Sequence, residues 1–246
     1  MAHPIFDITG RTALVTGSSR GIGRALAAGL VEAGCEVIVN GRDGERVRRA
    51  ADELGARALP FDNTDPGAVA RAVLDAGPID ILVNNTGMQY RAPFTEFPDE
   101  QWHALLATNL TSAFLVGREV AKGMVSRGAG KMINVLSLQS EVARPGIAAY
   151  SATKGALKML TKGMCADLAP HGIQVNGMGP GYFATELTAP LVADPEFSAW
   201  VERRTPAGRW GTLSDLVGTA IFLASPASDF VNGQVIYVDG GMLAVL

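Results

Sequence analysis

The sequence has very little cysteine. Only Cys35 and Cys165 occur among its 246 residues, and neither lies at a spacing typical of metal ligands. A disulfide framework of the kind that stabilises small secreted proteins is therefore excluded, and no metal site is expected. We interpret both cysteines as buried free thiols of a protein from a reducing compartment.

Long apolar runs and concentrated positive charge are also missing. No stretch of about 18 residues is free of charges and turn formers, so the sequence predicts no membrane-spanning helix. Residues 1–7 lack the basic start and apolar core of a signal peptide. The formal charge is −3, and the scattered lysines and arginines form no basic stripe for nucleic acid. We expect a cytoplasmic protein with no membrane or nucleic-acid partner.

The chain instead alternates short apolar runs with longer amphipathic segments. The apolar runs, which we expect to be strands, are residues 12–16, 36–40, 58–61, 79–84, 131–136, 173–178 and 234–239. Helices are expected at residues 22–33, 44–54, 65–75, 99–125, 149–168 and 213–223. Strands without polar alternation are buried on both faces, and strand–helix–strand repetition makes them parallel with right-handed crossovers.

This pattern predicts an α/β fold, a Rossmann-like doubly wound seven-stranded parallel sheet with helices on both faces. The composition marks no linker and no repeat, so residues 1–246 are expected to form a single domain. Residues 180–211 carry proline and glycine without an apolar period, and we predict an irregular insertion there. Ligands of such sheets bind at the carboxyl ends of the strands.

A glycine-rich turn, residues 16–23, follows the first expected strand. Its glycines permit a tight bend and let a pyrophosphate approach the free amides at the start of the next helix. The spacing departs from the Gly-x-Gly-x-x-Gly fingerprint, and a merely structural turn is the alternative. Its position after the first strand of an alternating chain favours a phosphate site formed by Gly17, Ser19, Arg20, Gly21, Ile22 and Gly23.

The tip of the second strand lacks the acidic residue that holds the ribose diol of NAD. It ends at Asn40, and Asp43 lies beyond Arg42. Arg42 and Arg20 would instead flank a 2′-phosphate through charge-assisted hydrogen bonds, which favours NADP over NAD. Two solvated surface arginines are the alternative. Asp62, after the third strand, either hydrogen-bonds an adenine amino group or caps the following turn.

Polar residues also follow the later strands. After the fourth strand, Asn85 can tie backbone segments together, and Gly87 leaves room for a flat ligand. Asn109 is a poor helix former inside the long helix, so we expect a local irregularity where its side chain holds a water. Ser137 directly follows the fifth strand and presents its hydroxyl at the ligand edge. Thr185, after the sixth strand, is placed to hold a carboxamide.

Tyr150 and Lys154 lie one turn apart in an expected helix, on the same face. A free tyrosine has a pKa of ~10, too high for ready proton exchange at neutral pH. A nearby ammonium favours phenolate, and lowering the pKa by ~3 units corresponds to about 4 kcal/mol. The pair is a candidate for general acid–base chemistry, although the same spacing also arises by chance on exposed helices.

Taken together, these motifs resemble the short-chain dehydrogenase/reductase family. The shared features follow the family's order and spacing over essentially the whole chain, and they are residues 16–23, 84–87, Asn109, Ser137, Tyr150, Lys154, Pro180, Gly181 and 238–241. Thr86 departs from the alanine usual in the family, and we expect it to be tolerated. The resemblance implies a dinucleotide-binding and catalytic domain that uses NADP, with NAD possible, and assembles as a homotetramer through its long helices and C-terminal segment.

The resemblance also implies a role for each site residue. Tyr150 would protonate the substrate carbonyl, or accept the proton in reverse, and Ser137 would hydrogen-bond the same oxygen. Lys154 would hold the nicotinamide ribose and lower the pKa of Tyr150, and Asn109 would hold a water in a proton relay. The cofactor supplies the hydride. Beyond the phosphate turn, the implied cofactor contacts are Asn40, Arg42, Asp62, Asn63, Asn85, Gly87, Tyr150, Lys154, Pro180, Gly181, Phe183 and Thr185.

Four longer stretches, residues 40–43, 140–147, 179–186 and 204–211, resemble family members that act on sugar acids. They imply reversible interconversion of D-gluconate and 5-keto-D-gluconate. A sugar acid needs a cation for its carboxylate and polar groups for its hydroxyls. The candidates are Arg91, Ser137, Gln139, Arg144 and Tyr150, with Glu141 as a further loop residue. Structural ion pairs are the alternative for the two arginines.

Other functions stay open at this point. Sugar, polyol and 3-oxoacyl-thioester reductases share the scaffold, so acyl-thioester reduction is the alternative reaction. A catalytically silent NADP-binding regulator is the alternative of a different class, and the intact set of four catalytic candidates argues against it. Tyr182, Phe183 and Trp210 in the insertion form either a lid over the substrate or a hydrophobic wall.

Overall fold

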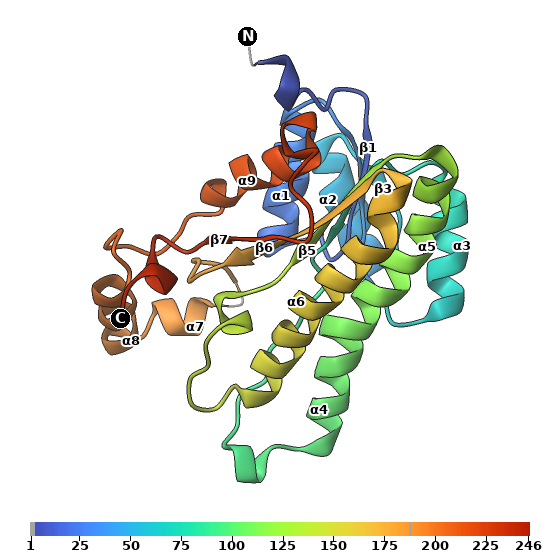
Figure 1. Cartoon of the computed structure of the whole chain (residues 1–246). Helices are drawn as coiled ribbons and strands as arrows, with labels where there is room; N and C mark the ends of the chain where they lie inside the picture. Colours follow the sequence, from blue (N-terminus) through green and yellow to red (C-terminus); the bar gives the residue numbers. More distant parts are fainter. Residues whose placement is uncertain (1–2, 187) are drawn as a thin grey trace.

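The fold is built on one parallel sheet of seven strands in the order β3-β2-β1-β4-β5-β6-β7, a doubly wound topology as predicted (Figure 1). The computed structural model describes residues 3–186 and 188–246. The first two residues of the N-terminal stretch and residue 187 of the expected insertion lie outside them. The strands are β1 (Thr12–Val15), β2 (Glu36–Val39), β3 (Arg57–Ala58), β4 (Ile81–Asn84), β5 (Gly130–Val135), β6 (Ile173–Pro180) and β7 (Val235–Val238).

Both faces of the sheet are apolar because successive strand residues point to opposite sides. In β2, Val37 and Val39 pack into one core and Ile38 packs into the other. β4 repeats the pattern, with Val83 on the first side and Leu82 on the second. Burial on both faces explains the absence of polar alternation in these runs.

Helices cover both faces, as the sequence predicts (Figure 1). The first core is closed by α1 (Gly21–Glu32), α2 (Gly44–Leu54) and α9 (Ser214–Ala224). The second core is closed by α3 (Pro66–Ala76), α5 (Ser112–Arg127) and α6 (Ala148–Leu168). No helix within residues 3–186 and 188–246 is long and apolar enough to cross a membrane.

The predicted third strand, residues 58–61, is wrong in length and position. The paired segment is Arg57–Ala58 alone. Leu59 and Phe61 still donate backbone hydrogen bonds to Val39 and Gly41, at 2.9 and 3.1 Å. Pro60 between them has no amide proton, so the regular ladder stops.

The predicted long helix at residues 99–125 is interrupted, and the insertion at 180–211 is not irregular throughout. The first contains α4 (Asp99–Leu106), a π-helical turn (Ala107–Thr111) and then α5. The second contains α7 (Ala189–Val192) and α8 (Pro195–Arg204). The side chain of Asp194 caps α8 by accepting from the amides of Glu196 and Phe197. Asp194 followed by Pro195 is a helix-start signal that the sequence contains.

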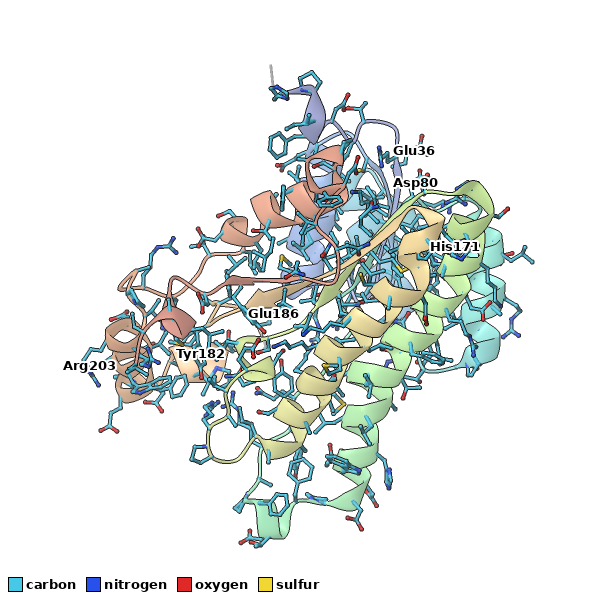
Figure 2. The ribbon with its side chains drawn as sticks, viewed as in Figure 1. Glu36, Asp80, His171, Tyr182, Glu186 and Arg203 are labelled. Atoms are coloured by element: carbon cyan, nitrogen blue, oxygen red, sulfur yellow. The ribbon has the colours of Figure 1, made fainter. Side chains whose placement is uncertain are left out.

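The carboxyl ends of the strands form one edge, where the ligand is expected. The strand order reverses between β1 and β4, which are adjacent, and ligands bind at such a switch point. Figure 2 shows Glu36, Asp80 and His171 toward the amino ends of β2, β4 and β6, well away from Tyr182 and Glu186, which follow the carboxyl end of β6. The predicted motifs all lie on the side of Tyr182 and Glu186, at the carboxyl ends of the strands.

Candidate active site

The turn between β1 and α1 is shaped to take a phosphate. Gly17 and Gly21 have φ angles of +61° and +56°, a region that favours glycine. A Cβ at Gly23 would lie 2.3 Å from Asn85 Nδ2 and 2.5 Å from the Gly17 carbonyl oxygen, so only glycine fits. Arg20 precedes α1 without making a side-chain cap, which leaves the amides of the first turn available to an anion.

Asn40 organises this turn from inside the protein. Its side chain is fully buried and accepts from the Gly17 amide at 3.2 Å and from Asn63 Nδ2 at 2.9 Å. It also donates to the carbonyls of Leu59 and Phe61, both at 3.2 Å. Asn40 therefore positions the loops around the phosphate turn, and its amide does not face a ligand.

The segment after β4 is tied to the same turn. Asn85 Nδ2 donates to the carbonyls of Thr16 and Gly17 at 3.0 and 3.1 Å. The Thr86 hydroxyl accepts from Asn63 Nδ2 at 2.8 Å. The threonine that departs from the family's alanine thus gives Asn63 a second acceptor and links the loops after β3 and β4. The sequence alone contains no signal for this partner.

After β2 and β3, the acidic side chains cap local structure, and the arginine Arg42 is exposed. Asp43 caps α2, accepting from the amides of Glu45 and Arg46 at 3.1 Å each. One oxygen of Asp62 caps its own turn through the amide of Thr64 at 2.8 Å. Arg42 is exposed. A carboxylate committed to a helix cap is not placed to hold a ribose diol, whereas an exposed arginine suits a 2′-phosphate.

Arg20 lines a cavity of about 860 Å³ between α1 and the segment that carries α7. Its Nη1 atom is 3.8 Å from Glu186 Oε2, an exposed ion pair of little energetic weight. The predicted phosphate ligands that line this cavity are Ser19, Arg20 and Gly21, and Thr185 lines its other side. The four predicted catalytic residues lie outside it.

Lys154 is buried beneath the end of β5. Its side chain is 4% exposed, and Nζ donates to the Val135 carbonyl at 2.8 Å. A Cβ on Gly87 would lie 3.8 Å from this Nζ, which places the loop after β4 directly against it. Burial lowers the pKa of Lys154 from 10.5 to about 8. The ammonium therefore loses its proton more readily than an exposed lysine.

Tyr150 lies over Lys154, with Nζ at 5.9 Å from the ring centroid. The expectation that Lys154 lowers the pKa of Tyr150 is not met in this structure. Burial of the phenol raises the pKa of Tyr150, and a hydrogen bond with Ser137 opposes part of that shift. The reason is geometric, since desolvation acts on the hydroxyl while the ammonium is beside the ring.

Ser137 is the residue at which β5 gives way to a short 3₁₀ turn. Its hydroxyl accepts from the Gln139 amide at 3.2 Å and donates to Gln139 Oε1 at 2.5 Å. Gln139 therefore occupies the hydrogen-bond donor that Ser137 would offer to a substrate oxygen. Together with the Tyr150 contact, this places Ser137 between the phenol and the substrate loops.

Asn109 lies in the π-helical turn, which confirms the expected irregularity. Its Nδ2 donates to the Met88 carbonyl at 3.0 Å and to Thr153 Oγ1 at 3.1 Å, and its Oδ1 accepts from the Met88 amide at 2.7 Å. Both amide protons are thus used within the protein. The side chain fastens the loop after β4 to α6 and has no donor left for a water.

Thr153 connects Asn109 to the helix that carries Tyr150, and it was not predicted from the sequence. It is fully buried, and its hydroxyl donates to the Tyr150 carbonyl at 2.8 Å while accepting from Asn109. A threonine between Tyr150 and Lys154 gives no recognisable signal, because helical threonines commonly bond their own preceding turn. Its second partner is visible only in three dimensions.

Two arginines and a tyrosine gather beyond Ser137. Arg91, Arg144 and the Tyr182 hydroxyl are close enough to affect one another's pKa, and Gln139 is close enough to affect that of Tyr182. Partial burial and the charge of Arg144 lower the pKa of Arg91. Glu141 points elsewhere: its Oε1 accepts from Lys158 and, at 2.6 Å, from Tyr237. The basic pair thus lies beside Gln139 and away from this carboxylate.

The residues of the segment after β6 mainly pack against neighbouring parts of the protein. Phe183 is 4% exposed, and its ring fills the space that a Cβ on Gly211 would need. Gly181 lies so close to β7 that a Cβ would be 2.7 Å from the Asp239 Cα. The Thr185 hydroxyl is 3.0 Å from the Thr188 hydroxyl. Pro180 ends β6, and the segment that follows it continues along the ligand edge of the sheet.

A doubly wound sheet, a phosphate turn after β1 and a Tyr–Lys pair on the helix after β5 define the class of protein. A family profile described as enoyl-(acyl carrier protein) reductase matches residues 17–243. The chain belongs to the short-chain dehydrogenase/reductase family.

Its relatives include sugar-acid enzymes over their full length. The chain is 54% identical to the gluconate 5-dehydrogenase of Gluconobacter oxydans (strain 621H), with 100% of both chains covered. It is 50% identical to the 5-keto-D-gluconate 5-reductase of Escherichia coli (strain K12), covering 99% of this chain and 100% of the relative. The solved structure of a gluconate 5-dehydrogenase from Burkholderia cenocepacia J2315, in complex with NADP and tartrate, matches with a TM-score of 0.95 at 53% identity and 99% coverage of each chain.

Proposed function

We propose that this protein is an NADP-preferring oxidoreductase that interconverts D-gluconate and 5-keto-D-gluconate. The observation that carries the proposal is that Arg91 and Arg144 lie close to Tyr182, which in turn lies close to Tyr150, while Gln139 bonds Ser137. A carboxylate-binding pair next to a proton-transfer pair suits a hydroxy acid. The sugar-acid names of relatives at 54% and 50% identity support the same substrate.

In the proposed reduction, Tyr150 donates its phenolic proton to the substrate carbonyl oxygen, and the Ser137 hydroxyl turns from Gln139 Oε1 to donate to the same oxygen. The nicotinamide supplies the hydride when it is bound. Lys154 would hold the nicotinamide ribose and, beside the phenol, would serve as a proton source. Oxidation runs the same path in reverse, with Tyr150 as the base. Asn109 and Thr153 would position the helix that carries Tyr150.

The residues around the phosphate turn fit a dinucleotide. The cradle left by Gly23 and the uncapped start of α1 suit a pyrophosphate, with Ser19, Gly21 and Ile22 beside it. Asn85 and Gly87 would adjoin the nicotinamide end, and Asp62 with the backbone of Asn63 the adenine end. Backbone groups of Pro180, Gly181 and Phe183, with Thr185, would close over the middle. NADP in relatives' structures supports this assignment.

Turnover assays with both substrate classes test the reaction. The purified protein should reduce 5-keto-D-gluconate with NADPH and oxidise D-gluconate with NADP, at a kcat/KM roughly a hundredfold above that for a 3-oxoacyl or enoyl thioester. The kcat/KM for the thioester should be lower because an acyl chain cannot pair with the polar groups of a pocket that hydrogen-bonds sugar hydroxyls. Turnover of the thioester without turnover of 5-keto-D-gluconate would contradict the proposal.

Arg42→Ala should shift cofactor use. Loss of a charge-assisted bond to the 2′-phosphate is expected to lower the ratio of kcat/KM with NADPH to that with NADH by about tenfold. The rate with NADH should stay near that of the unchanged protein. Arg49→Ala, another exposed arginine on α2, is the matched control. An unchanged ratio in Arg42→Ala would remove this residue from the NADP site.

We further propose that the chain acts as a single cytoplasmic domain and assembles as a homotetramer, with residues 180–211 serving the substrate. Exposed apolar side chains support an assembly surface on the long helices: Phe114 on α5 is 44% exposed, and Met159 on α6 is 62% exposed. Phe230 and Leu246 are exposed near the C-terminal segment. Light scattering on the purified protein gives the mass directly.

A further inference from the structure

Tyr182, the first residue after the Pro180-Gly181 corner, is clamped by aromatic rings. We call Phe197, Trp200 and Trp210 the aromatic box. Tyr182 meets them edge to face, with ring centroids 5.6, 5.7 and 5.8 Å apart and interplanar angles of 73°, 87° and 81°. Edge-to-face pairs at this distance are favourable, so the tyrosine ring has a fixed orientation. The box comes from α8 and the loop that follows it.

The fixed ring aims a neutral hydroxyl at the substrate loops. Burial raises the pKa of Tyr182, and the charge of Arg144 and a hydrogen bond with Gln139 oppose part of the shift. The phenol therefore keeps its proton at neutral pH and is a hydrogen-bond donor. Gln139 also accepts from the Ser137 hydroxyl at 2.5 Å, so its amide side chain lies near both Ser137 and Tyr182.

Arg144 is held by one ring of the same box. Its guanidinium carbon lies 5.2 Å from the Phe197 ring centroid, a cation–π contact. Its Nε is buried and has no hydrogen-bond partner in the described part of the chain. No carboxylate of residues 3–186 and 188–246 forms an ion pair with Arg144 or Arg91. A buried donor without an acceptor is costly, which indicates that a bound anion completes it.

We infer that Tyr182 determines specificity for acids, its hydroxyl donating to the substrate carboxylate alongside Arg144 while the aromatic box holds both side chains in place. The inference rests on the proposed function, because it needs a sugar-acid substrate. The placement of Gln139 agrees with such a substrate, because Gln139 bonds the Ser137 hydroxyl and also lies close enough to Tyr182 to affect its pKa.

A role as a simple hydrophobic wall makes a different prediction. A wall needs only the ring, and Tyr182→Phe would preserve every aromatic contact of the box. A carboxylate donor needs the hydroxyl, and the same change would remove it. Tyr237→Phe is the matched control, because Tyr237 on β7 also donates its phenolic hydrogen, to Glu141 at 2.6 Å, and is outside the proposed substrate site.

The first experiment compares D-gluconate with D-glucitol, in which CH₂OH replaces the carboxylate. Tyr182→Phe should raise the KM for D-gluconate about tenfold, as expected for a lost hydrogen bond to a charged group, with kcat changed less than about twofold. The KM for D-glucitol, or its inhibition constant if it acts only as a competitive inhibitor, should stay unchanged. Tyr237→Phe should alter neither. An unchanged KM for D-gluconate in Tyr182→Phe, or an equal change for D-glucitol, would overturn the inference.

A double-mutant cycle with Arg144→Gln tests whether the two groups share one ligand. Coupled donors to one carboxylate should give a combined increase in KM well below the product of the single increases. Full multiplicativity would overturn the shared site. Failure of the unchanged protein to turn over any sugar acid would remove both the proposed function and this inference. Normal turnover with an unaffected Tyr182→Phe would remove only the inference.

Discussion

Tyr150→Phe should lower kcat for 5-keto-D-gluconate reduction by about a thousandfold. A positioned general acid contributes on the order of 10²–10⁴ in rate, and phenylalanine keeps the ring while removing the proton that the substrate oxygen needs. Ser137 and Lys154 remain, so the dissociation constant for NADPH should change little. Steady-state rates and fluorescence titration of NADPH measure the two quantities separately.

The pH dependence supplies an independent check on Tyr150. Oxidation needs the phenolate as base, and burial raises the pKa of Tyr150, so the phenolate is scarce at neutral pH. The rate of D-gluconate oxidation should therefore rise with pH through neutrality and beyond, while reduction, which uses the protonated phenol, should not. Tyr150→Phe should abolish that rise. A variant that keeps both the rate and the profile would show that another group transfers the proton.

Much of the fold follows from local sequence pattern. The strands, the helices on both faces and the phosphate turn were predictable because they depend on apolar periodicity and on glycines placed after the first strand. Ser137 could be placed at the ligand edge because it directly follows the fifth strand and parallel strands share one carboxyl edge, whereas Tyr150 was identified from its one-turn spacing to Lys154. Asn109 was correctly expected at an irregularity because asparagine disfavours a helix interior.

The side-chain contacts that could not be predicted from the sequence involve partners that are distant along the chain. Asn109 bonds Met88 and Thr153, and neither partner is fixed by spacing. The aromatic box around Tyr182 exists because α8 folds back onto the end of β6, inside a segment predicted to be irregular. The direction of the Tyr150 pKa shift likewise depends on how deeply the phenol is buried, which a four-residue spacing does not reveal.

Lys154→Met should inactivate the protein and make it more stable. Turnover is expected to fall by about a hundredfold or more, because the ribose loses its ammonium partner and the phenol its neighbouring proton source. The apo protein, in contrast, no longer buries a charge. The difference between a pKa of 10.5 and one of about 8 corresponds to about 3 kcal/mol in favour of the neutral form. Losing the donor to the Val135 carbonyl costs about 1 kcal/mol, so the net gain is about 2 kcal/mol.

The gain in stability should depend on pH with a defined sign. Below pH 8, Lys154 is charged in both the folded and the unfolded states, and the folded state carries the full cost of burial. Between pH 8 and 10.5 the folded state releases its proton first, so the unchanged protein gains stability as pH rises. The advantage of Lys154→Met should therefore be full at pH 7 and vanish toward pH 10.5.

Thermal unfolding of the apo protein measures this directly. The midpoint of Lys154→Met at pH 7 should lie about 4–8 °C above that of the unchanged protein. Lys162→Met, an exposed lysine on the same helix, is the control and should show no such gain. A Lys154→Met variant less stable at pH 7 would mean that the ammonium is stabilised where it lies. The expected result would instead identify Lys154 as a residue whose function requires it to be buried at a cost to the fold, a trade-off between activity and stability.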